Sequence, residues 1–237
     1  MIYLKMMNLD LYKLQTLVEN FKNEIIGDSE SVRHKCFCIS YPLSLYLQIN
    51  GYHNSLKGGN FLAPLRSINH TWIELNNGII IDATIEQFSE YLSIKDLPFM
   101  FLNDFENDNL NTDKHNKWFQ PLKNNDEWFE KTSNGFKEYF KNIHRYIGED
   151  SVGIDIRELL KISLKAAIII NKEIDKRRID VNHINRTDTK ECLTYFNFIS
   201  YMINTSNNKD LSPVISEFKN NEDYHNLTSK IQSIQID

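Results

Sequence analysis

The sequence predicts an α+β fold, in which helices and a small antiparallel sheet are followed by a helical bundle. Residues 70–82 predict the sheet, because β-branched and aromatic residues flank the turn-forming run Asn76-Asn77-Gly78 on both sides, as in a β-hairpin. Helices are predicted before and after this hairpin, because apolar residues recur there at steps of three and four.

The first two helices have clear ends. Residues 10–26 form one apolar stripe that ends at Gly27, and residues 37–49 form a second helical segment closed by Asn50-Gly51. Pro42 leaves the start of the second helix open, because proline fits only the first turn of a helix. That helix therefore begins near Cys38 or Ser40, or it is kinked at Pro42.

The chain changes character after the hairpin. Residues 103–125 are polar and rich in asparagine, which is typical of a loop, and nearly all that follows has helical periodicity. The expected later helices are 136–147, 156–174, 187–203 and 213–231. We therefore expect an α+β core at 1–102, a polar connecting loop at 103–125 and an α-helical region at 126–237.

Composition excludes several classes of protein. The 237 residues are 41% apolar and 25% charged, as in ordinary globular proteins. The net charge is -5 and the lysines form no basic stripe, so we expect no nucleic-acid partner. Three cysteines are too few for a disulfide framework. With no leader peptide and no long apolar run, we expect a cytoplasmic protein without a membrane partner.

The loop length of the predicted hairpin decides whether His70 and Asp82 lie on the same face of the sheet. If residues 76–78 form a three-residue loop with Gly78 in the left-handed bulge position, Trp72 faces Asp82. His70 then lies diagonal to Asp82 on the same face, at about 7 to 8 Å between backbone positions, within reach of one hydrogen bond. A two-residue loop would instead send His70 and Asp82 to opposite faces.

Cysteine, histidine and aspartate side chains suited to thiol catalysis occur in one order along the chain. A thiolate nucleophile needs a base to take its proton, and the base needs a third group that fixes its tautomer. His70 and Asp82 fit the last two roles. A cysteine at a helix start is favoured as a thiolate by the helix dipole, so the residues alone allow either Cys36 or Cys38 as the nucleophile.

These pieces resemble the transglutaminase-like branch of the papain-like cysteine fold. In that group a helix opens with the catalytic Cys, carries a small residue four positions on and ends in Gly, and a later His-x-Trp-x-Glu strand leads to an Asp-x-Thr strand. The matching pieces here are Cys36, Ser40 and Gly51, then His70-Thr71-Trp72-Ile73-Glu74, then Asp82-Ala83-Thr84. The resemblance covers about residues 30–90 and departs at Lys35, which replaces a common glycine.

The resemblance implies a papain/transglutaminase-like core in which the helix carrying the Cys packs on the sheet. It implies a cysteine hydrolase or acyl transferase that needs no cofactor and acts on an amide bond of a peptide or protein substrate through a thioester. Cys36 would be the nucleophile, His70 the base and acid, and Asp82 the orienting group. Trp72 and Gly59 are expected to contact substrate. Protease, deamidase and transamidase activities all stay open.

Two other interpretations stand beside this one. The alternative function is an inactive binding module that docks a protein partner through its helical region. A zinc site at His34, Cys36 and Cys38 is not expected, because one intervening residue does not match the usual two to four. The remaining histidines are expected to be ordinary surface residues: His53, His115, His144, His183 and His225.

Overall fold

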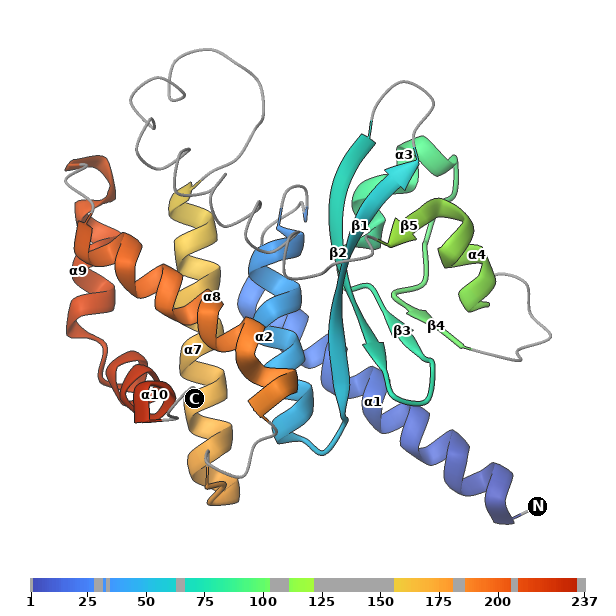
Figure 1. Ribbon diagram of the computed structural model, residues 1–237, viewed down its shortest axis with the longest axis horizontal. Coiled ribbons are helices and arrows are strands. Elements are labelled where there is room, and N and C mark those ends of the chain that lie inside the picture. The colour runs from blue at the N-terminus through green and yellow to red at the C-terminus, as the bar shows by residue number, and fades with distance from the viewer. Residues whose placement is uncertain are drawn as a thin grey trace.

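The computed structural model describes residues 2–27, 32, 35–62, 67–102, 111–121, 156–180, 186–205 and 209–233. Within these ranges a five-stranded antiparallel sheet lies beside a group of helices (Figure 1). The predicted α+β class is therefore confirmed. The helix expected at 136–147 lies outside the described residues. None of the described helices is both long and apolar enough to cross a membrane.

The sheet has the strand order β4-β3-β2-β1-β5. Its strands are β1 (Asn54–Leu62), β2 (Ser67–Leu75), β3 (Ile80–Ile81), β4 (Met100–Phe101) and β5 (Phe119–Pro121). Only β2 and β3 match strands that the sequence predicts. β1 was missed because Gly58-Gly59 in its middle is typical of a turn, and β4 and β5 are too short to show any periodicity.

Residues 111–121 correct the expectation of a connecting loop. They form α4 (Thr112–Trp118) and then β5, which pairs with β1 at the edge of the sheet. The Phe119 side chain is 0% exposed and packs on Phe61 of β1, with ring centroids 5.5 Å apart. This buried aromatic contact fixes a segment whose composition is otherwise polar, so the loop prediction is wrong for these residues.

Helix α2 (Cys36–Ile49) lies at the centre of the molecule. It packs against β1 and β2 on one side and against α7 (Ile156–Arg177) and α8 (Arg186–Thr205) on the other (Figure 1). A helix covered on two sides buries nearly its whole circumference, which explains why its apolar residues are not confined to one stripe. One hydrophobic cluster accordingly includes residues of α2, of the sheet and of the C-terminal helices.

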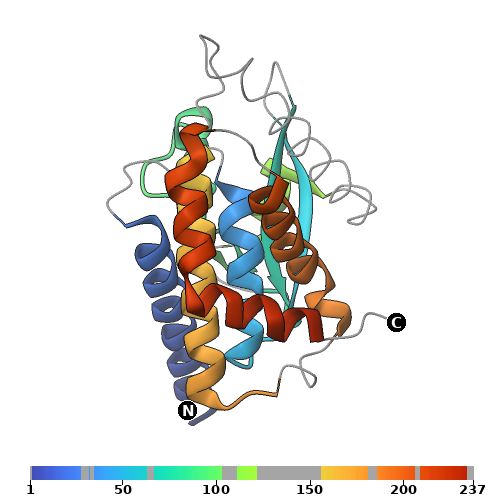
Figure 2. The same ribbon diagram turned by 90° about the vertical axis from the view of Figure 1, so that its left-hand side faces the viewer.

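The remaining helices cover the outside of this core. α1 (Ile2–Ile26) buries the predicted stripe of Leu14, Val18, Phe21 and Ile25 and runs beside α7 (Figure 2). The predicted helix at 213–231 is instead two helices, α9 (Ser212–Asn220) and α10 (Glu222–Ser233), because Asn221 takes an extended conformation between them. The Asn221 side chain accepts a bond from the Tyr224 N–H and thereby starts α10.

Candidate active site

Helix α2 begins at Cys36, earlier than Pro42 suggested. The expectation of a start near Cys38 or Ser40 is wrong, and Pro42 lies inside the helix. An interior proline costs about 3 kcal/mol in an isolated helix. Here α2 is packed between the sheet and two helices, and those contacts outweigh the cost. Cys36 therefore stands in the first turn, where backbone N–H groups point out of the helix end.

A stripe of small polar residues sets how closely α2 approaches the sheet. Ser40, one turn after Cys36, donates from its hydroxyl to the Thr71 carbonyl of β2 at 3.1 Å. Ser44, one turn further, donates to the side-chain oxygen of Asn54 in β1 at 2.6 Å. Residues four apart share a helix face, so these two bonds also direct Cys36 toward β2.

The hairpin has the predicted register. Ile73 pairs with Ile81 and Glu74 with Ile80, which continues to Trp72 opposite Asp82. Gly78 has φ 82° and donates to the Leu75 carbonyl at 2.8 Å, so the loop is the predicted three-residue one. His70 and Asp82 consequently lie on one face of the sheet.

His70 and Asp82 form a completely buried pair. His70 Nε2 lies 2.7 Å from Asp82 Oδ2, and both side chains are 0% exposed. The backbone holds Asp82 in place, because its N–H donates to the Phe99 carbonyl at 2.8 Å and its Oδ1 accepts from the Thr84 N–H at 3.3 Å. The Asp82 carboxylate is therefore held in place beside the imidazole.

The Cys36 thiol also interacts with His70. Cys36 lies close enough to the imidazole to affect its pKa, and Gln87 Nε2 lies 3.4 Å from His70 Nδ1. Burial lowers the pKa of His70, but the charge and hydrogen bond of Asp82, together with Cys36, raise it to about 9. Burial raises the pKa of Asp82, but His70 and a second histidine hold it well below its usual range. The pair is therefore set up as imidazolium and carboxylate.

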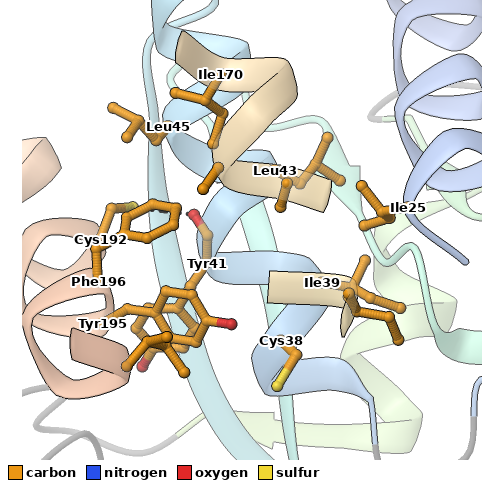
Figure 3. Close-up of a cluster of buried hydrophobic side chains, with 14 of the residues drawn as sticks. Ile25, Cys38, Ile39, Tyr41, Leu43, Leu45, Ile170, Cys192, Tyr195 and Phe196 are labelled. Atoms are coloured by element: carbon orange, nitrogen blue, oxygen red, sulfur yellow. Dashed lines mark hydrogen bonds between the residues drawn. The ribbon is translucent and has the colours of Figure 1, made fainter. Parts of the chain in front are cut away.

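The other two cysteines belong to the hydrophobic core. Cys38 is 3% exposed and lies with Tyr41 of α2 near Tyr195 of α8 (Figure 3). Burial raises the pKa of the Cys38 thiol to about 12, which keeps it protonated. Cys192 is fully buried and donates to the Tyr41 carbonyl. Of these cysteines only Cys36 is partly exposed, so the structure favours it over Cys38.

Trp72 and Gly59 lie under the site rather than on its surface. The Trp72 ring is 2% exposed and stands 6.1 Å from the His70 ring, centroid to centroid. A Cβ on Gly59 would meet the Trp72 ring and the Gln120 carbonyl at 2.5 Å, so only glycine allows β1 and β5 to close over the indole. Trp72 packs near the His70 ring, and Gly59 pairs with His70 across the two strands. Contact of either residue with substrate stays a prediction.

His115 is the functional-site residue that the sequence interpretation missed. It was expected at the surface, but its side chain is 0% exposed and its Nε2 lies 3.1 Å from Asp82 Oδ2. That expectation is wrong because β5, which begins at Phe119 four positions after His115, pairs with β1. This pairing holds α4 against the sheet. The signal that could have identified it is the apolar pair Trp118-Phe119 inside a polar stretch.

Lys35 replaces the glycine that often precedes the nucleophile in the resembled group. Its side chain is nearly buried and its Nζ lies 2.7 Å from Glu158 Oε1 of α7. The ion pair fixes the residue before Cys36 to the C-terminal helical region. The start of α2 is therefore held from the helical side as well as from the sheet.

Within the described ranges, no group of three or more His, Cys, Asp and Glu side chains is placed to hold a metal ion. His34, part of the zinc site weighed above, lies outside them.

The chain matches no protein-family model, no curated protein and no solved structure with which it was compared. The site's own geometry is therefore the basis for a functional proposal.

The turn that sets the hairpin register gives a first testable prediction. Gly78→Val should lower the free energy of unfolding by about 1 to 3 kcal/mol, because a β-branched residue is strained at φ 82°. Gly78→Asn is the matched control, since asparagine tolerates positive φ. Urea unfolding measures both variants. Equal stability of the valine and asparagine variants would contradict the importance of this turn.

Proposed function

We propose that the protein is a cysteine hydrolase or acyl transferase that acts on an amide bond of a peptide or protein substrate through a thioester. One observation carries the proposal: a buried His70–Asp82 hydrogen-bonded pair lies next to Cys36, the only partly exposed thiol among the described cysteines. Two features support a papain/transglutaminase-like core. Cys36 stands at the start of a helix packed on an antiparallel sheet, and His70 and Asp82 come from one hairpin of that sheet.

The residues have distinct roles in the proposed reaction. In the proposed resting state the Cys36 proton already lies on His70, and the Cys36 thiolate attacks the amide carbonyl carbon to form a tetrahedral oxyanion. As the oxyanion collapses, the C–N bond breaks and the His70 imidazolium protonates the leaving amine. Water or an amine, deprotonated by His70, then attacks the thioester and releases Cys36. Asp82 stays ionised and holds the imidazole throughout.

The start of α2 supplies the proposed oxyanion donor. Lys35, at the N-cap position, makes no side-chain capping bond to the first turn. The backbone N–H of Cys36 therefore points out of the helix end beside the thiol, where a tetrahedral oxyanion would form. The positive end of the helix dipole favours the same negative charge.

Alkylation of the native protein tests this proposal without knowledge of the substrate. At pH 6, iodoacetamide should label Cys36 about tenfold faster in the wild type than in His70→Ala, because an imidazolium favours the reactive thiolate. Peptide mass spectrometry identifies the labelled cysteine. The inactive binding module needs no such chemistry, so equal rates in the two proteins would favour it.

The chain offers a matched control for this experiment. Cys38→Ser removes a nearby thiol that is buried and protonated, so labelling at pH 6 should be unchanged. Cys36→Ser should remove the label. If Cys36→Ser retains rapid labelling and Cys38→Ser loses it, the nucleophile has been assigned to the wrong cysteine.

A further inference from the structure

Asp82 is shared by two imidazoles that come from different parts of the chain. His70 of β2 and His115 of α4 both place Nε2 on the same oxygen, Asp82 Oδ2, at 2.7 and 3.1 Å. The Thr84 N–H occupies the other oxygen, Oδ1. A single orienting contact to His70 does not require this third donor, so the role of His115 needs its own explanation.

The surroundings of His115 fix which ring nitrogen carries the proton. Its ring lies among Trp72, Phe101 and Phe119, with centroids 5.2, 4.9 and 4.6 Å away. Nδ1 is buried and has no hydrogen-bond partner among the described residues. A proton on Nδ1 would leave that donor unpaired and would set the Nε2 lone pair against the carboxylate. The proton therefore sits on Nε2 and is donated to Asp82.

Burial, more than the charged groups around it, favours the neutral form of His115. Asp82, His70 and Glu74 are the ionisable groups that act on it from the sheet and the segment after it. Burial among the aromatic rings is the largest effect and lowers its pKa, while the hydrogen bond and charge of Asp82 oppose this and the positive charge of His70 adds to it. His115 thus supplies a hydrogen bond to Asp82 without competing with His70 for its negative charge.

We propose that His115 is a positioning residue for the Cys36–His70 pair, acting through Asp82. Its Nε2–H and the Thr84 N–H hold the two carboxylate oxygens, so Oδ2 stays directed at His70 Nε2. Without His115, the Asp82 carboxylate can rotate away from His70. This inference rests on the proposed function, because it assigns His115 a part in forming the same thiolate and imidazolium.

The test compares two replacements that each keep one property of His115. His115→Phe keeps the aromatic packing and loses the donor, whereas His115→Gln keeps an N–H of similar reach. The rate of Cys36 alkylation by iodoacetamide is measured from pH 4 to 9. His115→Phe should shift the midpoint of this profile upward by about one pH unit, and His115→Gln should restore most of the shift. An unchanged or lower midpoint in His115→Phe overturns the proposal.

Two further proteins separate positioning from packing. In an Asp82→Asn background, His115→Phe should cause no additional shift, because its partner is already altered. Phe101→Leu disturbs the packing around His115 and removes none of the hydrogen bonds of Asp82 described above, so it should lower stability in urea and leave the midpoint unchanged. A midpoint that moves in Phe101→Leu as much as in His115→Phe shows that packing alone is responsible, and it overturns the proposal.

The same measurements distinguish failure of this inference from failure of the proposed function. If wild-type alkylation at pH 6 does not depend on His70, the proposed function is wrong. If it depends on His70 and is unaffected by His115→Phe, the proposed function stands and the positioning role of His115 is wrong.

Discussion

Cys36→Ala should lower turnover by about a millionfold, the largest effect expected for any change in this protein, because no thioester can form without the nucleophile. His70→Ala should lower it by a similar factor, since residues that act as one unit lose nearly everything together. Asp82→Asn should cost about ten-thousandfold, because an amide no longer favours the imidazolium or its correct tautomer.

Three assays cover the reactions that stay open. Fluorescent casein reports proteolysis, ammonia release from a glutaminyl peptide reports deamidation, and incorporation of a fluorescent primary amine reports transamidation. The assay in which the wild type turns over identifies the reaction, and the variants are then compared in it. Cys38→Ser is the control and should keep at least most of the wild-type rate. Turnover retained by Cys36→Ala or His70→Ala would contradict the proposed triad.

The second large effect concerns stability as a function of pH. The folded pKa of His70 is raised from its ordinary value of 6.5 to about 9, so the native state binds its proton more tightly than the unfolded state does. That stabilisation is complete below pH 6.5 and is lost as the pH rises through about 9. The pKa of Asp82 is lowered, so its contribution is present above its ordinary value of 3.8 and is lost as the pH falls.

Urea unfolding between pH 6 and 10 measures this loss. Relative to His70→Gln, the free energy of unfolding should fall by roughly 3 kcal/mol over this range. Both proteins carry Cys36→Ala, so that titration of the thiol does not contribute; because Cys36 also helps to raise the pKa of His70, the fall of roughly 3 kcal/mol is an upper bound. The glutamine variant has no group that titrates at this position and serves as the baseline. Parallel stability curves for the two proteins would show that His70 is not held as an imidazolium in the folded state.

The local geometry of the candidate site could be predicted from the sequence. The hairpin register follows from Gly78, because an odd loop places His70 and Asp82 on one face and only a residue tolerant of positive φ closes it. The amphipathic stripes likewise located α1, α7 and α8, since helical periodicity reports which face is buried. These features depend on residues close together in the chain.

The tertiary structure decided what sequence periodicity does not encode. Cys36 and Cys38 both lie in the first turn of α2, and only packing against α8 shows that Cys38 is buried and protonated. His115 joins Asp82 across 33 positions because β5 pairs with β1, a contact between short strands with no periodic signature. The sequence by itself therefore determined the His-Asp hairpin and helices α1, α7 and α8. Long-range packing alone buried Cys38, left Cys36 partly exposed and brought the second imidazole to Asp82, because burial and strand pairing depend on residues far apart in the chain.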